Sequence, residues 1–329
     1  MEEQMVDSIR TQLLHRRDRL QEFIREERKS PQIVKLLQDV DLALERLNDG
    51  SYGLCEICHE DIEPSYLRVE PLVTVCLSHL SVEQQRAIER DLQLASEVQV
   101  NLLPTRNMKI KGWELGYHYE PVGPVSGDYC DVVPSPSSTG EAYFFFGDVS
   151  GKGVAASLLV SHLHAMFRSL VSSNLPLARL VERANRLFCE SAMSTNFATL
   201  VCGKVSPSGE IEICNAGHCY PLIVKGGKIR SIESNGLPLG TFFNAEYHSK
   251  VTQLADNDFL FLYTDGLTEA RNPKDEEYSE AQLSALVAKE WQLTPEKLID
   301  SCVNDCSRFR AGAGKMDDLT IMVLRKVSA

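Results

Sequence analysis

The sequence predicts a mixed α+β protein in which a helical hairpin precedes a β-sandwich flanked by helices. Within residues 1–50, apolar residues recur at helical spacing in two stripes. From Trp113 onward, short apolar runs rich in strand-forming residues alternate with longer helical stretches. The runs 142–146 and 258–263 are apolar on both alternating faces, which indicates strands covered on both sides by other layers.

Composition and charge restrict the class of protein. The chain has 329 residues, 43% of them hydrophobic and 24% charged, a balance typical of globular proteins and a length typical of two domains. A net charge of −12 argues against binding to nucleic acid through bulk charge. The first twenty residues are charged throughout, and no apolar run is long enough to span a bilayer. We therefore expect a cytoplasmic protein that binds neither membranes nor nucleic acid directly.

The first two predicted helices form an antiparallel hairpin. Arg16 interrupts the first stripe, which consists of Ile9, Leu13, Leu20 and Phe23. The second stripe has heptad spacing and consists of Ile33, Leu37, Val40, Leu44 and Leu47. Between them, Ser30 is suited to cap the second helix and Pro31 to begin it, since no hydrogen bond is lost there.

A paired cysteine motif follows the hairpin. Cys55 and Cys58 form one knuckle, and Cys76 and His79 form another after 17 intervening residues. This spacing is typical of a tetrahedral zinc site with three thiolates and one imidazole. His59 is an alternative fourth ligand, but His79 has the better spacing. The chain has ten cysteines in all, and we expect most of the other seven to be small buried hydrophobic residues.

The segments ALERLNDGSYGLCEICHEDI and VCLSHL resemble the DksA/TraR zinc-finger family over roughly residues 1–80. Members of that family pair such a finger with helices and can enter the secondary channel of RNA polymerase. Two features depart from the family pattern: His79 replaces the usual last cysteine, and the hairpin tip at 25–30 carries no paired aspartates. The resemblance therefore implies a structural, dimerising or signal-sensing module.

A third helix is predicted at 81–103 and ends before Pro104. A weak heptad runs along this helix, with seam residues Ile88, Leu92, Ala95 and Leu102. The helix either forms a coiled-coil homodimer, in which Gln99 sets the register, or packs on its own domain. The expected organisation is a helical hairpin with a zinc finger at 1–80, a linker helix at 81–104 and a catalytic domain at 105–329.

The C-terminal region alternates strands and helices. Predicted strands are 142–146, 198–205, 210–216, 258–263 and 319–324, and predicted helices are 153–172, 176–193, 279–290 and 294–309. Four short acidic segments stand out. Two of them contain Asp148 and Asp265, which come directly after buried apolar runs. The other two contain Asp128 with Asp131, and Asp317 with Asp318. A carboxylate beside a buried strand is costly unless a cation or hydrogen bonds compensate it. All-oxygen ligands favour Mg²⁺ or Mn²⁺ over zinc.

The ordered motifs GDYxD, GDVSGKGxxA, NAGHxxP, LPLG, YTDGLTEA and DDLT resemble the SpoIIE-type phosphatases of the PPM/PP2C superfamily over roughly residues 90–326. The resemblance implies a PP2C-like β-sandwich and two divalent ions at one of its ends. It assigns Asp148 as the bridging ligand, with the carbonyl of Val149 on one ion. It gives Asp265 and Asp317 to the other ion, and Asp128 to the second ion directly or through water.

The implied function is protein serine/threonine dephosphorylation by water activated between two metals, with Asp148, Asp265 and Asp317 as catalytic residues. The usual substrate of the family is a phosphorylated anti-sigma-factor antagonist. Lys152 either helps to bind phosphate or is a solvated surface lysine. His218 is either a general acid or, as we expect, a structural residue. The alternative function is a non-enzymatic transcription regulator whose DksA-like module binds RNA polymerase.

Overall fold

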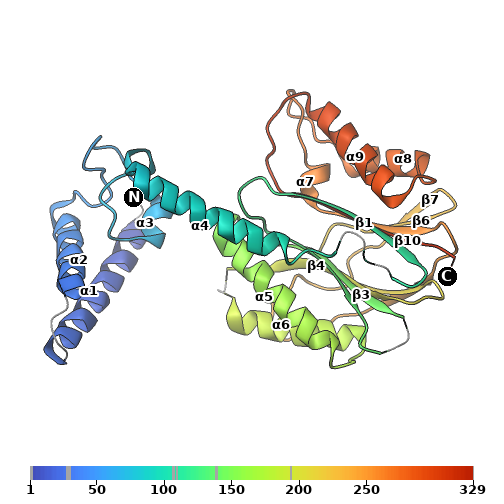
Figure 1. Ribbon diagram of the computed structural model, residues 1–329, viewed down its shortest axis with the longest axis horizontal. Coiled ribbons are helices and arrows are strands. Elements are labelled where there is room, and N and C mark those ends of the chain that lie inside the picture. Colours follow the sequence, from blue (N-terminus) through green and yellow to red (C-terminus); the bar gives the residue numbers. More distant parts are fainter. Residues whose placement is uncertain are drawn as a thin grey trace. The chain divides into compact units, whose positions relative to one another are not determined.

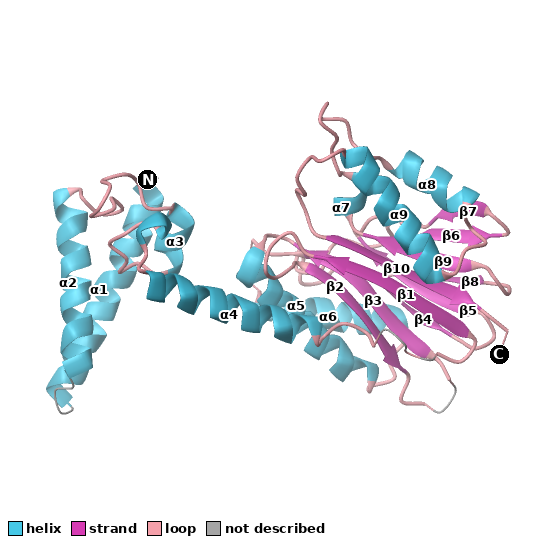
Figure 2. Cartoon of the chain, turned by 45° about the horizontal axis from the view of Figure 1, so that its top comes forward, coloured by secondary structure: helices cyan, strands magenta, loops and turns pink. Residues whose placement is uncertain are grey.

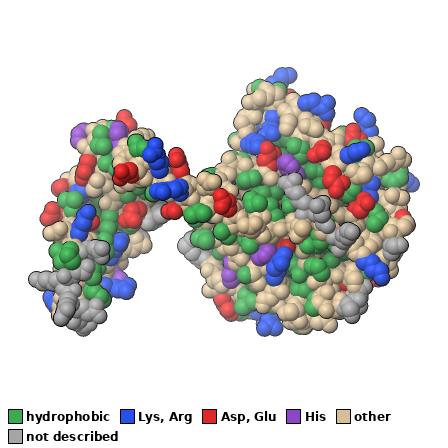
Figure 3. Space-filling view, viewed as in Figure 1, with side chains coloured by type: hydrophobic (Ala, Val, Ile, Leu, Met, Phe, Trp, Pro, Cys, Tyr) green, Lys and Arg blue, Asp and Glu red, His purple; other side chains and the backbone are tan. Residues whose placement is uncertain are grey.

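The structure, a computed structural model, describes residues 3–26, 31–105, 108, 110–137, 140–192 and 195–328 (Figure 1). The chain divides into two compact units, Met1–Arg90 and Asp91–Ala329, and the division falls within helix α4 (Val82–Val100). Each unit has a hydrophobic core of its own. Acidic and basic side chains are intermixed over the face of both units seen in Figure 3.

The first unit is built on the predicted helical hairpin. Helices α1 (Glu3–Glu26) and α2 (Pro31–Asp49) pack along each other. They are antiparallel, because Arg10 near the start of α1 donates hydrogen bonds to Asn48 Oδ1 (2.7 Å) and to the Leu47 carbonyl (3.1 Å) at the end of α2. Both predicted stripes supply the core, which includes Ile9, Leu13, Val40, Leu44 and Leu47. Pro31 begins α2 as expected, whereas Ser30 lies outside the described residues.

The second unit contains two antiparallel five-stranded sheets stacked face to face (Figure 2). The first has the order β1 (Trp113–Glu120), β10 (Leu319–Lys326), β9 (Phe259–Tyr263), β6 (Leu222–Lys225) and β7 (Lys228–Ser231). The second has the order β2 (Asp128–Pro134), β3 (Ala142–Val149), β4 (Ala198–Val205), β5 (Glu210–Ala216) and β8 (Lys250–Gln253). Side chains from both inner faces form one core, among them Phe144, Phe146, Leu262 and Met322.

Helices cover the outer face of each sheet (Figures 1 and 2). Helices α5 (Gly153–Val171) and α6 (Leu177–Ser191) pack on the β2–β8 sheet, and α7 (Asp265–Thr268), α8 (Glu280–Lys289) and α9 (Pro295–Arg310) pack on the other. In the described residues, α5 is the one helix long and apolar enough to cross a membrane by length and composition. Its buried side, including Val160, Leu163 and Phe167, belongs to the core against β2 and β3.

The predicted fold class, a sandwich flanked by helices and preceded by a helical hairpin, is confirmed. The runs at 198–205 and 210–216 form β4 and β5 with the predicted bounds. Strands β1, β2, β6, β7 and β8 are additional to those predicted.

Candidate active site and metal centre

The four predicted acidic segments meet at one end of the sandwich. Asp128 begins β2 and lies directly opposite Asp148, which is next to last in β3. Asp265 follows the end of β9, and Asp317 precedes β10, the antiparallel neighbour of β9. The two loops touch, because a Cβ atom added to Gly266 would lie 2.0 Å from the carbonyl oxygen of Asp318. Segments far apart in sequence therefore place their carboxylates together.

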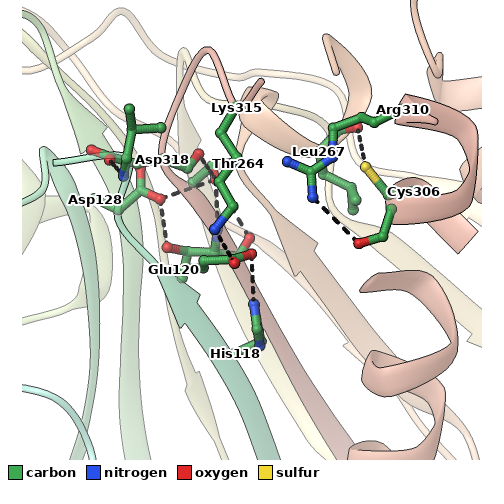
Figure 4. Close-up of polar contacts among 12 residues, drawn as sticks. His118, Glu120, Asp128, Thr264, Leu267, Cys306, Arg310, Lys315 and Asp318 are labelled. Carbon is green, nitrogen blue, oxygen red and sulfur yellow. Dashed lines mark hydrogen bonds and ion pairs between the residues drawn. The ribbon is translucent and has the colours of Figure 1, made fainter. Parts of the chain in front are cut away.

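Asp128 is held between the two sheets. Only 3% of its surface is exposed, and its Oδ2 accepts hydrogen bonds from the hydroxyls of Thr264 (3.1 Å) and Thr320 (2.5 Å) (Figure 4). Burial, followed by the charge of Asp148, raises the pKa of Asp128 well above its usual range. The two threonines were not predicted as site residues, although Thr264 directly precedes Asp265 and Thr320 lies three positions after Asp317.

Asp318 also contributes to the site, although it was noted only as part of the acidic segment 316–320 and was not predicted as a site residue. Its Oδ1 accepts a hydrogen bond from the backbone N–H of Val122 (2.7 Å). Its Oδ2 accepts from the Ser126 hydroxyl (2.7 Å) and from the backbone N–H of Gly127 (2.9 Å). Asp318 therefore joins the start of β10 to the loop that leads into Asp128 (Figure 4). The adjacent acidic pair in the DDLT motif was the available signal.

The remaining carboxylates repel one another. Burial, and then the charges of Asp265 and Asp317, raises the pKa of Asp148 to about 7. Burial, followed by the charge of Asp317, also raises the pKa of Asp265. A Cβ atom at Gly127 would lie 3.0 Å from both Asp148 Oδ1 and the Val149 carbonyl oxygen, so these two oxygens lie close to the same glycine. Glycine keeps the space around both oxygens open.

The chemistry of these donors fits hard divalent cations. The acidic cluster of Asp128, Asp148, Asp265 and Asp317, with the Val149 carbonyl, supplies only oxygen, the ligand type that Mg²⁺ and Mn²⁺ prefer. Among the residues that the structure describes, Lys152 is the one cation in an ion pair with these four carboxylates. One exposed lysine does not offset several partly buried negative charges, whereas divalent ions do.

Lys152 is exposed at the surface and forms an ion pair with Asp317, while a role in phosphate binding stays a prediction. Its Nζ donates to Asp317 Oδ2 (3.0 Å) and to the Met316 carbonyl oxygen (2.9 Å). It therefore holds the segment that carries Asp317 against the start of α5. Both residues line a cavity of 330 Å³, together with Glu269, Arg271, Arg310 and Lys315.

His218 has a structural environment. It is 5% exposed, and its Nε2 donates to the Tyr263 carbonyl oxygen (3.2 Å). Its Nδ1 then accepts a hydrogen bond from the Thr199 hydroxyl (2.8 Å). Burial lowers the pKa of His218 to about 4, so the ring is neutral with both nitrogens engaged. It joins β9 to β4 behind the acidic cluster, which favours the structural interpretation over a general acid.

The first unit contains a separate metal centre. The ligand atoms of Cys55, Cys58, Cys76 and His79 all lie within 4.8 Å of one another. In the described part of the chain, this is the one group of His, Cys, Asp or Glu residues that meets this criterion, and the aspartates of the acidic cluster do not. His79 Nδ1 lies 3.1 Å from Cys76 Sγ, whereas His59 lies outside the group. Three sulfurs and one nitrogen at this spacing fit tetrahedral zinc.

Arg46 supports this finger and was not predicted to do so. Its side chain is nearly buried, and it donates to the carbonyl oxygens of Ser51 and Leu54 and pairs with Glu56 (3.3 Å). The Glu56 N–H donates to the Thr74 carbonyl oxygen (2.9 Å), which joins the two knuckles. The end of α2 thus holds the loop that carries the first two cysteines.

Known proteins resemble this chain in both its catalytic region and its zinc finger. Residues 138–327 match the family model of Stage II sporulation protein E (SpoIIE), and residues 50–78 match the prokaryotic dksA/traR C4-type zinc finger. The Bacillus subtilis protein named phosphoserine phosphatase RsbU is 23% identical over 245 residues, which are 74% of this chain and 72% of RsbU.

Two solved structures show the same fold. The SiaA-PP2C domain of Pseudomonas aeruginosa aligns with a TM-score of 0.65 at 17% identity, covering 74% of this chain and 99% of that domain. The PP2C phosphatase domain of SpoIIE from Bacillus subtilis, solved with a fragment of its regulatory domain, aligns with a TM-score of 0.57 at 18% identity. That alignment covers 67% of this chain and 64% of the other. The predicted PP2C-like sandwich is thereby confirmed.

Proposed function

The chain belongs to the SpoIIE family of PP2C-type protein serine/threonine phosphatases, and we propose that it dephosphorylates a regulatory phosphoprotein at the acidic cluster. The observation that carries this proposal is the convergence of Asp128, Asp148, Asp265 and Asp317 from both sheets at one end of the sandwich. The substrate class is a phosphorylated anti-sigma-factor antagonist, and the setting is bacterial signalling through sigma-factor control. The cytoplasm is the proposed location.

The cluster would hold two Mn²⁺ or Mg²⁺ ions, with Asp148 between them and the Val149 carbonyl on one. When bound, these ions supply a water that is deprotonated near neutral pH, and they neutralise charge on the phosphoryl oxygens. Asp265 and Asp317 would complete the other ion, and Asp128 would lie at the second ion directly or through water. Lys152 positions Asp317, and Asp318 positions the loop before Asp128. No protein nucleophile is required, since water attacks phosphorus directly.

The experiment is hydrolysis of a phosphoserine peptide by the full chain with Mn²⁺, with Mg²⁺ and after treatment with EDTA. We expect turnover that depends on the added ion and that disappears in Asp148→Ala. The matched control is Asp300→Ala on the exposed side of α9, a helix that carries no residue of the acidic cluster, and it should leave turnover unchanged. Metal-independent turnover would contradict the proposal. The absence of turnover under all three conditions would leave the non-enzymatic alternative as the better account.

The first unit would carry one zinc ion at Cys55, Cys58, Cys76 and His79. Zinc binding would stabilise the fold of this segment, because the segment is too small to bury a large core of its own. The division into a hairpin with finger at 1–80, a linker helix at 81–104 and a catalytic domain at 105–329 stays a proposal. We assign the finger a structural or signal-sensing role.

A homodimer through residues 81–103 also stays a proposal, with one correction. Gln99 does not set a coiled-coil register, because it is 5% exposed and exchanges hydrogen bonds with Ser126 of its own unit. Its amide donates to the Ser126 carbonyl oxygen (2.7 Å) and accepts from the Ser126 N–H (2.9 Å). The sequence reasoning treated this polar residue as part of a seam, whereas a backbone partner within the unit satisfies it. Leu94 and Val98, each more than half exposed, remain available to a partner.

A further inference from the structure

A second cavity lies between the two sheets, away from the acidic cluster. Its volume is 560 Å³, within the range of small-molecule sites. It is lined by strands β6 and β7 of one sheet and by β5 and β8 of the other. In the pairing of β6 with β9, the cavity residue Lys225 follows Val224, which pairs with Phe259, whereas Asp265 follows the opposite end of β9. The cavity is therefore separate from the proposed active site.

The floor of this cavity is apolar. Ile213, Ile223 and Ile232 line it, and each is less than a tenth exposed. All three belong to the core between the sheets. The cavity is thus an opening of the sandwich core toward solvent at the β7 and β8 edges.

The rim is basic, and strand geometry directs its charges inward. Lys225 is two residues from Ile223 and so lies on the same face of β6. Arg230 lies directly opposite Ile223, and Lys250 lies directly opposite Ile213. The Lys225 Nζ donates to the Thr252 hydroxyl (3.2 Å), and this hydrogen bond joins β6 to β8 across the cavity. The cavity lining includes no aspartate or glutamate.

Protection of sheet edges explains only part of this arrangement. Inward-pointing charges are a known device against edge-to-edge association, and β7 and β8 are both edge strands. Lys225, however, is on β6, which pairs with a strand on each side. It also lies directly opposite Lys228, and like charges in that position destabilise a sheet. Among the ion pairs of the described residues, none involves these two lysines, Arg230 or Lys250.

From these observations we infer that the cavity binds a small amphipathic anion, whose apolar body lies on the three isoleucines and whose carboxylate or phosphate lies among Lys225, Lys228, Arg230 and Lys250. Such a ligand offsets the repulsion of four like charges and packs its apolar body on the isoleucine floor. Neither an inorganic anion nor a neutral hydrocarbon satisfies both parts of the lining.

The test is calorimetric titration of the full chain with decanoate, and separately with decanol and with inorganic phosphate. We expect decanoate to bind once per chain, and decanol and phosphate to bind at least about tenfold more weakly. In the double variant Lys228→Gln with Arg230→Gln, decanoate affinity should fall by at least about tenfold. The matched control Lys297→Gln, an exposed lysine on α9, should bind decanoate as the parent does.

Thermal unfolding of the variants without ligand keeps the test decisive. The double variant should melt no lower than the parent, because it loses like-charge repulsion and no ion pair. The absence of decanoate binding at about 1 mM would overturn the inference. So would equal affinity in the double variant, or phosphate that binds as tightly as decanoate.

Discussion

Mutation of two neighbouring aspartates, Asp317 and Asp318, should change the stability of the second unit to different extents. Asp318 accepts three hydrogen bonds from the 122–127 loop. The Asp317 side chain is 46% exposed, pairs with the exposed Lys152 and accepts one exposed hydrogen bond from the adjacent Asp318 N–H (3.0 Å). We predict that Asp318→Ala destabilises the second unit and that Asp317→Ala does not. Both variants should lose phosphatase activity, because one loosens the loop before Asp128 and the other removes a proposed metal ligand.

The magnitude follows from the three donors that Asp318→Ala leaves without an acceptor. The Val122 N–H is exposed, so water replaces its partner at little cost. The Ser126 hydroxyl and the Gly127 N–H are partly buried, and each lost bond costs about 1–1.5 kcal/mol. The free energy of unfolding should therefore fall by about 2–3 kcal/mol. For Asp317→Ala, the lost surface ion pair and the relieved repulsion from Asp148 and Asp265 leave a change within about 0.5 kcal/mol.

The assay is urea unfolding in metal-depleted buffer, followed by tryptophan fluorescence. Trp113 and Trp291 are the only tryptophans of the chain, and both lie in the second unit, so the signal reports that unit alone. Asp318→Asn is the matched variant, since it keeps the shape of the side chain but removes its charge and one acceptor. Equal destabilisation by Asp317→Ala and Asp318→Ala would refute the reasoning, as would an unchanged midpoint for Asp318→Ala.

The other predictions concern the ion pair of a buried aspartate, the finger and the linker helix. Arg168→Met should destabilise the second unit by about 3 kcal/mol in urea unfolding, because Asp131 is fully buried and takes both 3.0 Å hydrogen bonds from that guanidinium; a loss below about 1 kcal/mol would contradict this. Elemental analysis should find zinc in the purified chain and none after Cys55→Ser with Cys58→Ser, while metal-stimulated phosphatase activity persists; zinc retained in that variant would refute the assignment. Light scattering should show a dimer, and Leu92→Glu should give a folded monomer with altered activity; a monomeric parent together with unchanged activity in Leu92→Glu would make the helix a passive spacer.

The strands that could be predicted from the sequence are those whose own residues are mostly apolar. The runs that form β3, β4, β5, β9 and β10 are mostly buried and stand out by composition. Strands β7 and β8 have four residues each, are largely exposed and contain lysine or arginine, so no alternation marks them. Strand β1 carries polar residues in its second half, where it is only partly buried. Edge strands gain order from pairing, which composition does not reveal.

The sequence indicated the proposed ligands of the candidate site but not the groups that hold them. Each of the four aspartates was found because a carboxylate beside glycine or a buried strand is unusual. Thr264 acts through a hydrogen bond across 136 residues of chain, and Thr320 and Asp318 act across 192 residues, so no local pattern signals such partners. For the same reason, the sequence left open whether Gln99 pairs with a second copy of the helix or within its own domain, and its partner is Ser126.

The central claim is that four aspartates hold the divalent ions that activate water. Equilibrium dialysis with Mn²⁺, run beside phosphoserine-peptide hydrolysis on the same samples, tests it most directly. The account predicts two Mn²⁺ ions per chain in the parent, with turnover that rises as they bind, and loss of both binding and turnover in Asp148→Ala. Parent-level turnover in Asp148→Ala at saturating Mn²⁺ would contradict it.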